Sequence, residues 1–318
     1  MGGLSWKGAW KQWRRAGWAA LLFGLLSGFL LGFSRCAPEE LPEESLLMIR
    51  VQWPDGSCSP VALEEFLAGV LAAEMPASFQ PQALQAQAVA ARSYILRQQD
   101  SGKHGEAAVC CDSQCCQAWL SRESLEQRWG ADFPAHWQKI RDAVAATAGQ
   151  VLLYRGEIID ALFCSTCGGM TEEVSAVWGG ERPYLPAHPC PYCRHSSRYS
   201  GVKRYTFAEA ASRLGLQPEQ IPEMELLSTT AGGRVALLAC GGRQYKGTEL
   251  RSLLELDSAA FSWLLQGKEI VLLSLGYGHG VGLCQWGADG MARAGHGCWE
   301  ILSFYYPGAE PGLAGDFL

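Results

Sequence analysis

The chain has 318 residues, a net charge of −6 at pH 7 and a pI near 5.6. This length is enough for one large or two ordinary domains with a full hydrophobic core. The acidic balance argues against a nucleic-acid-binding protein, which normally carries a basic patch or stripe.

The first 46 residues predict a membrane anchor followed by a linker. Four basic side chains precede an uncharged apolar run over residues 17–33, close to the minimum of about 17 residues that spans a bilayer. We predict a cytoplasmic tail over 1–16, a transmembrane helix over 17–35 and a Pro/Glu-rich linker over 36–46. Basic residues before the span place residues 47–318 outside the cytoplasm. A cleaved signal peptide is the alternative.

The next segment predicts a helix that carries an isolated acid. Ser59 and Pro60 resemble a helix N-cap and first helical position, and apolar residues follow at helical spacing to Met75. Glu74 continues this stripe and is the only charged residue between Glu65 and Arg92. Burial raises the pKa of a carboxyl group toward the range of a general acid. The alternative is a solvated helix end without a role, because Pro76 disfavours a longer helix.

Helices and hairpins alternate along the rest of the chain. Pro81 opens an alanine-rich helix, and a further helix over 137–148 stops at Gly149. Residues 151–163 and 234–247 predict two hairpins, Thr248 resembles the cap of a short helix, and 269–275 predict a buried strand. The class expected for 47–318 is therefore α+β, a single mixed domain with helices packed on antiparallel hairpins.

The buried strand leads into a glycine-rich loop, GYGHGVGLCQWGADG, which contains His279, Gln285 and Trp286. Glycines allow a backbone to approach a ligand closely. The spacing matches neither a P-loop nor a dinucleotide-binding fingerprint. Taken alone, such a loop is also compatible with a tight turn and a structural histidine.

Two long motifs and the terminal EILSFYYPG carry a family resemblance. The segment EEFLAGVLAAEMPASFQPQALQAQAVAARSYIL and the loop GYGHGVGLCQWGADGMA, in that order, resemble the stage II sporulation protein D family over roughly residues 46–310. The resemblance implies a lytic transglycosylase that cuts peptidoglycan glycan strands, especially strands stripped of their peptides, during engulfment in sporulation. A second branch of the family, the amidase enhancers, implies the alternative of a glycan-binding protein that stimulates a partner cell-wall amidase without cutting.

The resemblance also implies roles for individual residues. Glu74 occupies the position of the catalytic glutamate, which acts first as acid and then as base on the C6 hydroxyl of the sugar. The substrate-binding positions implied are Gln85, where relatives usually carry Lys, and Ser165, Thr166, His279 and Gln285.

Eight of the thirteen cysteines form two clusters of interest. His104, Cys110, Cys115 and Cys116 have the spacing at which some family members hold zinc, and four such ligands make a closed, structural site. Cys111 is an alternative to Cys110, and a disulfide or free thiols are the alternative to zinc.

The second cluster is a pair of CxxC motifs, formed by Cys164, Cys167, Cys190 and Cys193, a spacing that favours a second zinc site. Two disulfides or a redox-sensitive site are its alternatives. The other cysteines of the domain are expected to be small buried apolar residues; they are Cys58, Cys240, Cys284 and Cys298.

Overall fold

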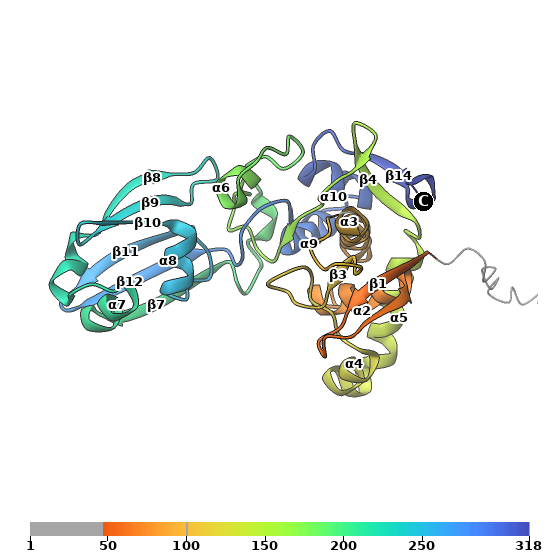
Figure 1. Ribbon diagram of the computed structural model, residues 1–318, viewed down its shortest axis with the longest axis horizontal. Helices are drawn as coiled ribbons and strands as arrows, with labels where there is room; N and C mark the ends of the chain where they lie inside the picture. The colour runs from red at the N-terminus through yellow and green to blue at the C-terminus, as the bar shows by residue number, and fades with distance from the viewer. Residues whose placement is uncertain (1–46, 100, 318) are drawn as a thin grey trace, which may run out of the picture. The chain divides into compact units, whose positions relative to one another are not determined.

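The computed structural model of the protein describes residues 47–99 and 101–317 (Figure 1). The predicted cytoplasmic tail, transmembrane helix and linker lie outside these residues. None of the helices within the described ranges combines the length and apolar character needed to cross a membrane.

Helices and strands alternate along the described chain. The helices are α2 (Leu63–Glu74), α3 (Pro81–Gln99), α4 (Arg122–Trp129), α5 (Phe133–Ala145), α6 (Val174–Trp178), α7 (Phe207–Leu214), α8 (Gly247–Leu253), α9 (Gln285–Arg293) and α10 (Cys298–Tyr305). Short 3-10 helices are η2 (Gly130–Asp132), η3 (Pro191–Cys193), η4 (Pro218–Glu223) and η5 (Ala314–Phe317). The fold is mixed α+β, which is the class expected from the sequence.

The strands are short. They are β1 (Met48–Gln52), β2 (Cys58–Ala62), β3 (Val109–Cys110), β4 (Gln150–Tyr154), β5 (Glu157–Ile158), β6 (Phe163–Cys164), β7 (Ser200–Thr206), β8 (Glu225–Thr229), β9 (Val235–Cys240), β10 (Arg243–Lys246), β11 (Phe261–Gln266), β12 (Glu269–Leu275), β13 (Leu283–Cys284) and β14 (Glu310–Leu313). Among the described residues they form small sheets in the orders β2-β1-β3, β10-β9-β8, β11-β12-β7, β13-β6 and β14-β4-β5. The pairs β1–β3 and β6–β13 are parallel and the others antiparallel.

Helix α3 is the centre of the larger hydrophobic core. Its alanines, among them Ala86 and Ala90, are fully buried, and α2, α5, α9, α10 and strand β4 all pack against it (Figure 1). Small side chains allow this close approach from several directions. Arg92, also fully buried, donates two hydrogen bonds to the Glu64 carboxylate at 2.6 and 2.8 Å and so joins α3 to α2.

A second hydrophobic core lies among α7, α8 and the strands β7–β12. It contains the predicted hairpin β9–β10, paired from Leu237–Lys246 to Cys240–Arg243, and the predicted buried strand β12. The first predicted hairpin is also present as β4–β5. The expected Thr248 cap is absent from the described structure of α8, which follows Lys246 without a side-chain cap.

The predicted start of the first helix is wrong. Ser59 and Pro60 lie in strand β2, opposite Val51 and Arg50, and the helix begins only at Leu63. Because β2 is the edge of its sheet, the missing N–H of Pro60 costs no ladder hydrogen bond.

Candidate functional site

The carboxylate of Glu74 is held at the very end of α2. Met75 takes an extended conformation and ends the helix. Glu74 Oε1 accepts a hydrogen bond from the backbone N–H of Ala118 at 2.8 Å, and Oε2 accepts one from Gln285 Nε2 at 3.1 Å. Burial raises the pKa of Glu74, and these two hydrogen bonds partly offset that effect. The group is therefore fixed in direction and biased toward the protonated form.

Glu74 lines a cavity of about 370 Å³. The walls come from the end of α2 and the loop after it, from α4 and α5, and from segments near Ser165, Arg198 and the start of α9. Two tryptophans and two arginines contribute to the lining, namely Trp129, Trp286, Arg128 and Arg198. A cavity of this size with aromatic and cationic groups suits a polar organic ligand.

The cavity brings together three of the six residues predicted to act on substrate. Ser165 and Gln285 line it together with Glu74, whereas Thr166 and Gln85 are absent from its described lining. Thr166 is buried, and its hydroxyl lies 2.8 Å from the Ser196 hydroxyl. Successive residues of an extended segment point to opposite sides, so Ser165 faces the cavity and Thr166 does not.

His279 also lies away from the described lining of the Glu74 cavity. Its Nδ1 accepts a hydrogen bond from the backbone N–H of Val281 at 3.1 Å, and its ring lies 4.9 Å from that of Trp178. Burial, with a contribution from Arg251, lowers the pKa of His279 to about 4. His279 is therefore a neutral residue that orders its own loop, and the structure gives it no contact with the cavity.

The glycines of this loop serve internal packing more than ligand approach. A Cβ on Gly276, whose φ is +77°, would stand 2.8 Å from the backbone nitrogen of Gly168. Only glycine combines that conformation with that contact. The expectation of a ligand close to the glycine backbone therefore does not hold at Gly276.

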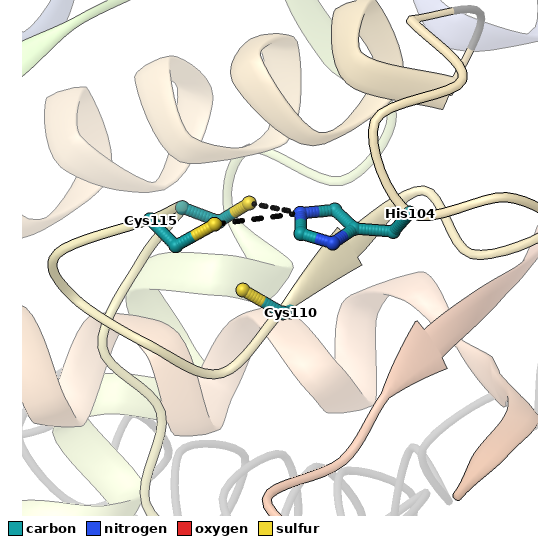
Figure 2. Close-up of side chains that lie close together, drawn as sticks. His104, Cys110 and Cys115 are labelled. Carbon is teal, nitrogen blue, oxygen red and sulfur yellow. Dashed lines mark hydrogen bonds between the residues drawn. The ribbon is translucent and has the colours of Figure 1, made fainter. Parts of the chain in front are cut away.

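The first predicted metal cluster is assembled in the structure. The ligand atoms of His104, Cys110, Cys115 and Cys116 all lie within 4.8 Å of one another. His104 Nε2 lies 3.1 Å from Cys116 Sγ and 3.7 Å from Cys115 Sγ. Figure 2 shows the sulfur atoms of Cys110 and Cys115 near the His104 ring. Burial lowers the pKa of His104 and so favours the neutral imidazole that metals require.

The second predicted cluster has one different member. The four sulfur atoms that lie within 4.8 Å of one another belong to Cys167, Cys190, Cys193 and Cys284. Cys284 thus takes the place of Cys164 in the group, and it is fully buried as expected. The parallel pair β6–β13 brings Cys284, which is distant in the sequence, next to Cys164.

Several residues of the site were not predicted. Ala118 contributes only a backbone N–H, which carries no signal in the sequence. Arg198 is held by stacking over the Tyr277 ring at 4.1 Å. Buried Asp289 accepts a hydrogen bond from the Gln80 N–H at 2.8 Å and so ties the loop after Glu74 to α9. The presence of Asp289 in the glycine-rich motif was the feature of the sequence from which this last contact could have been predicted.

Comparisons with known proteins identify the family of the chain. The family model described as "Stage II sporulation protein" matches residues 56–154, a range that contains Glu74 and the cluster of His104, Cys110, Cys115 and Cys116. Stage II sporulation protein D of Bacillus subtilis (strain 168) is 38% identical over 266 residues, covering 82% of this chain and 78% of that protein. The protein of the same name from Bacillus amyloliquefaciens is 36% identical over 82% of this chain and 77% of its own length.

A more distant relative has a different name. The amidase enhancer of Bacillus subtilis (strain 168) is 27% identical over 76% of this chain and 39% of its own length. Stage II sporulation protein D has the higher sequence identity, and its alignment with this chain covers most of both proteins. Both facts favour the sporulation protein over the amidase enhancer. The chain therefore belongs to the stage II sporulation protein D family.

Proposed function

We propose that this sporulation protein is a lytic transglycosylase that cleaves peptidoglycan glycan strands, with Glu74 as its catalytic acid and base. The observation that carries the proposal is the setting of Glu74. It is a carboxyl group with a raised pKa, oriented by two hydrogen bonds, in the wall of a ligand-sized cavity. Within the described residues, the lining of that cavity holds no second carboxyl group.

A single carboxyl group favours transglycosylation over hydrolysis. Hydrolysing glycosidases generally use two carboxyl groups, of which the second activates water or attacks the sugar. In the proposed reaction, protonated Glu74 gives its proton to the glycosidic oxygen as the bond from that oxygen to C1 breaks. The ionised carboxylate then takes the proton of the C6 hydroxyl of the same sugar, and the C6 oxygen bonds to C1. This closes a 1,6-anhydro ring, returns the proton to Glu74 and consumes no water.

The other cavity residues have supporting roles in this proposal. Gln285 orients the carboxylate and lowers its pKa by stabilising the ionised form that exists between the two steps. Trp129 and Trp286 offer apolar ring faces to sugars, and Arg128 and Arg198 offer donors to sugar oxygens or carboxylates. The hydroxyl of Ser165 is a further donor and acceptor in the same wall.

Zinc at the first cluster fits the residues present. The nitrogen-to-sulfur distances of 3.1 and 3.7 Å bracket the separation of about 3.6 Å between two ligands of a tetrahedral zinc ion. His104, Cys110, Cys115 and Cys116 would hold it. Because four protein ligands close its coordination shell, the ion would be structural. It would fix the segment that ends in Ala118, two residues beyond Cys116, and hence one hydrogen bond to Glu74.

We further propose that the protein is a single-pass membrane protein with residues 47–318 outside the cytoplasm, at the mother-cell membrane during engulfment. The support is the basic and apolar pattern of residues 1–35, which lie outside the described structure. Its partners would be glycan strands and a cell-wall amidase of the same membrane. Protease treatment of intact and permeabilised protoplasts, prepared before engulfment is complete, tests the orientation: a domain that resists protease until the membrane is opened contradicts it.

The second candidate function is a non-catalytic enhancer of a partner amidase, which the similarity to the amidase enhancer favours. Purified protein incubated with peptide-free glycan separates the two. A transglycosylase releases 1,6-anhydro-ended fragments, and Glu74→Gln releases none while retaining its fold. An enhancer releases no fragments in either form but raises the rate of the amidase. Equal release by wild type and Glu74→Gln would remove Glu74 from the mechanism.

A further inference from the structure

The second sulfur cluster joins three segments that are far apart in the sequence. Cys167 follows β6, Cys190 precedes η3, Cys193 ends η3, and Cys284 ends β13. All four side chains are buried, with at most 2% of their surface exposed. Such a group is either a set of thiols within the core, a pair of disulfides or a metal site.

The spacing of the sulfur atoms favours a metal. Cys167 Sγ and Cys193 Sγ are 3.6 Å apart. Bonds of about 2.3 Å to a tetrahedral zinc ion place two sulfur ligands about 3.8 Å apart, whereas a disulfide requires about 2.05 Å. The residues converge on one point in three dimensions, because all four sulfurs lie within 4.8 Å of one another.

The surroundings of the cluster favour thiolates. Two backbone N–H groups, of Cys167 and Gly287, point at Cys284 Sγ at 3.2 and 3.3 Å. The Tyr305 hydroxyl lies 3.1 Å from Cys190 Sγ. Buried Arg234 donates to the carbonyl of Cys167 at 3.0 Å. Donors of this kind stabilise the net negative charge of four thiolates around one divalent ion.

One glycine makes this arrangement possible. A Cβ on Gly287 would collide with the Tyr305 hydroxyl and would stand 2.9 Å from Cys190 Sγ. Glycine at this position therefore lets the first turn of α9 approach the sulfur atoms closely enough for its N–H to reach Cys284.

We propose that Cys167, Cys190, Cys193 and Cys284 bind a second structural Zn²⁺ ion, which fixes the part of the cavity wall that contains Gln285. Each of the two hydrogen-bond donors to Glu74 then belongs to a different metal site. Ala118 is two residues beyond Cys116 of the first cluster, and Gln285 directly follows Cys284 of the second. The two clusters together hold both carboxylate oxygens in place. The assignment of the metal is independent of the proposed function, whereas the positioning role of Gln285 rests on it.

The metal content of the full-length protein tests the proposal. Protein purified under reducing conditions without chelator is expected to contain two zinc ions per chain, one for each cluster. Cys284→Ser and Cys115→Ser are each expected to contain one. Cys164→Ser is the matched control, because Cys164 is equally buried and lies opposite Cys284 but outside the four-sulfur set. It is expected to retain both ions.

Two further measurements keep the proposal testable if a variant fails to fold. X-ray absorption at the zinc edge of the wild type is expected to show sulfur neighbours at about 2.3 Å. Their average number per zinc ion should exceed three, which is the number that the first cluster alone supplies. Hydrogen exchange of residues 285–293 is expected to increase in Cys284→Ser and to stay unchanged in Cys164→Ser. Neither readout depends on glycan cleavage, so each separates this proposal from the proposed function.

Three results would overturn the assignment. One is a single zinc ion per chain in the wild type. Another is loss of one ion in Cys164→Ser but not in Cys284→Ser. A third is two ions per chain that both survive Cys284→Ser, which would place the second metal elsewhere.

Discussion

The hydrogen bond between Gln285 and Glu74 allows a sharp test of the proposed acid. Gln285 is almost fully buried, and its Nε2 lies 3.1 Å from Glu74 Oε2. Gln285→Leu keeps a side chain of similar volume and removes this donor. Since the bond stabilises the ionised carboxylate, its loss raises the pKa of Glu74 further.

The size of the effect follows from the kind of bond that is lost. A hydrogen bond to a charged group contributes about 1.5–3 kcal/mol. The lower end applies here, because the Ala118 N–H remains in place and Glu74 is only partly buried. A loss of about 1.5 kcal/mol changes the ionisation equilibrium of Glu74 about tenfold. The alkaline limb of the cleavage profile should therefore move to higher pH, because the first step needs protonated Glu74.

The assay is the release of new glycan ends from peptide-free strands, measured as kcat/KM across pH. Ser165→Ala is the control, since Ser165 lines the same cavity and its hydroxyl makes no hydrogen bond to Glu74 in the described structure. Its alkaline limb should coincide with that of the wild type. If the alkaline limb of the kcat/KM profile of Gln285→Leu coincides with that of the wild type, or lies at lower pH, the reasoning is refuted.

Three other predictions concern stability. Arg92→Met should lower the free energy of unfolding in urea by about 2–4 kcal/mol, because removal of the buried cation leaves the Glu64 carboxylate unpaired. The control is Arg122→Met, which removes an exposed ion pair and should change the free energy of unfolding by less than about 0.5 kcal/mol. Gly287→Ala should cost about 1–3 kcal/mol by overpacking, whereas Gly315→Ala meets no neighbouring atom and should be neutral. Glu74→Gln should gain thermal stability relative to wild type as pH rises from 4.5. The reason is that the raised pKa of Glu74 in the folded state makes the wild type less stable as the carboxyl group ionises. A difference in melting temperature between the two proteins that stays constant as pH rises from 4.5 contradicts the raised pKa.

Local signals predicted much of the fold. Pro81 at the first position of α3, the turn residues of the β9–β10 hairpin and the apolar run of β12 each act within a few residues. The same kind of signal failed at Ser59 and Pro60. There the edge position of β2, which no local pattern reveals, makes a proline acceptable in a strand.

The site was predictable only where its chemistry is carried by side chains in a motif. Glu74 and the first cluster could be found in this way. The second cluster could not be assigned correctly, because Cys284 has no neighbouring cysteine and reaches the others only through the parallel pairing of β13 with β6. The Ala118 donor is a backbone group, and buried Arg92 is held by Glu64 and by the carbonyl of Gln150, which come together only in the folded chain.

The central claim is that Glu74 acts as the only catalytic carboxyl group: it gives a proton to the glycosidic oxygen and regains one from the C6 hydroxyl of the sugar, so that no water is consumed. Cleavage of peptide-free glycan in water enriched in oxygen-18 tests it most directly, with mass analysis of the new ends. The account predicts anhydro-ended fragments that carry no heavy oxygen. Fragments that gain one heavy oxygen atom per cleaved bond would show hydrolysis and contradict it.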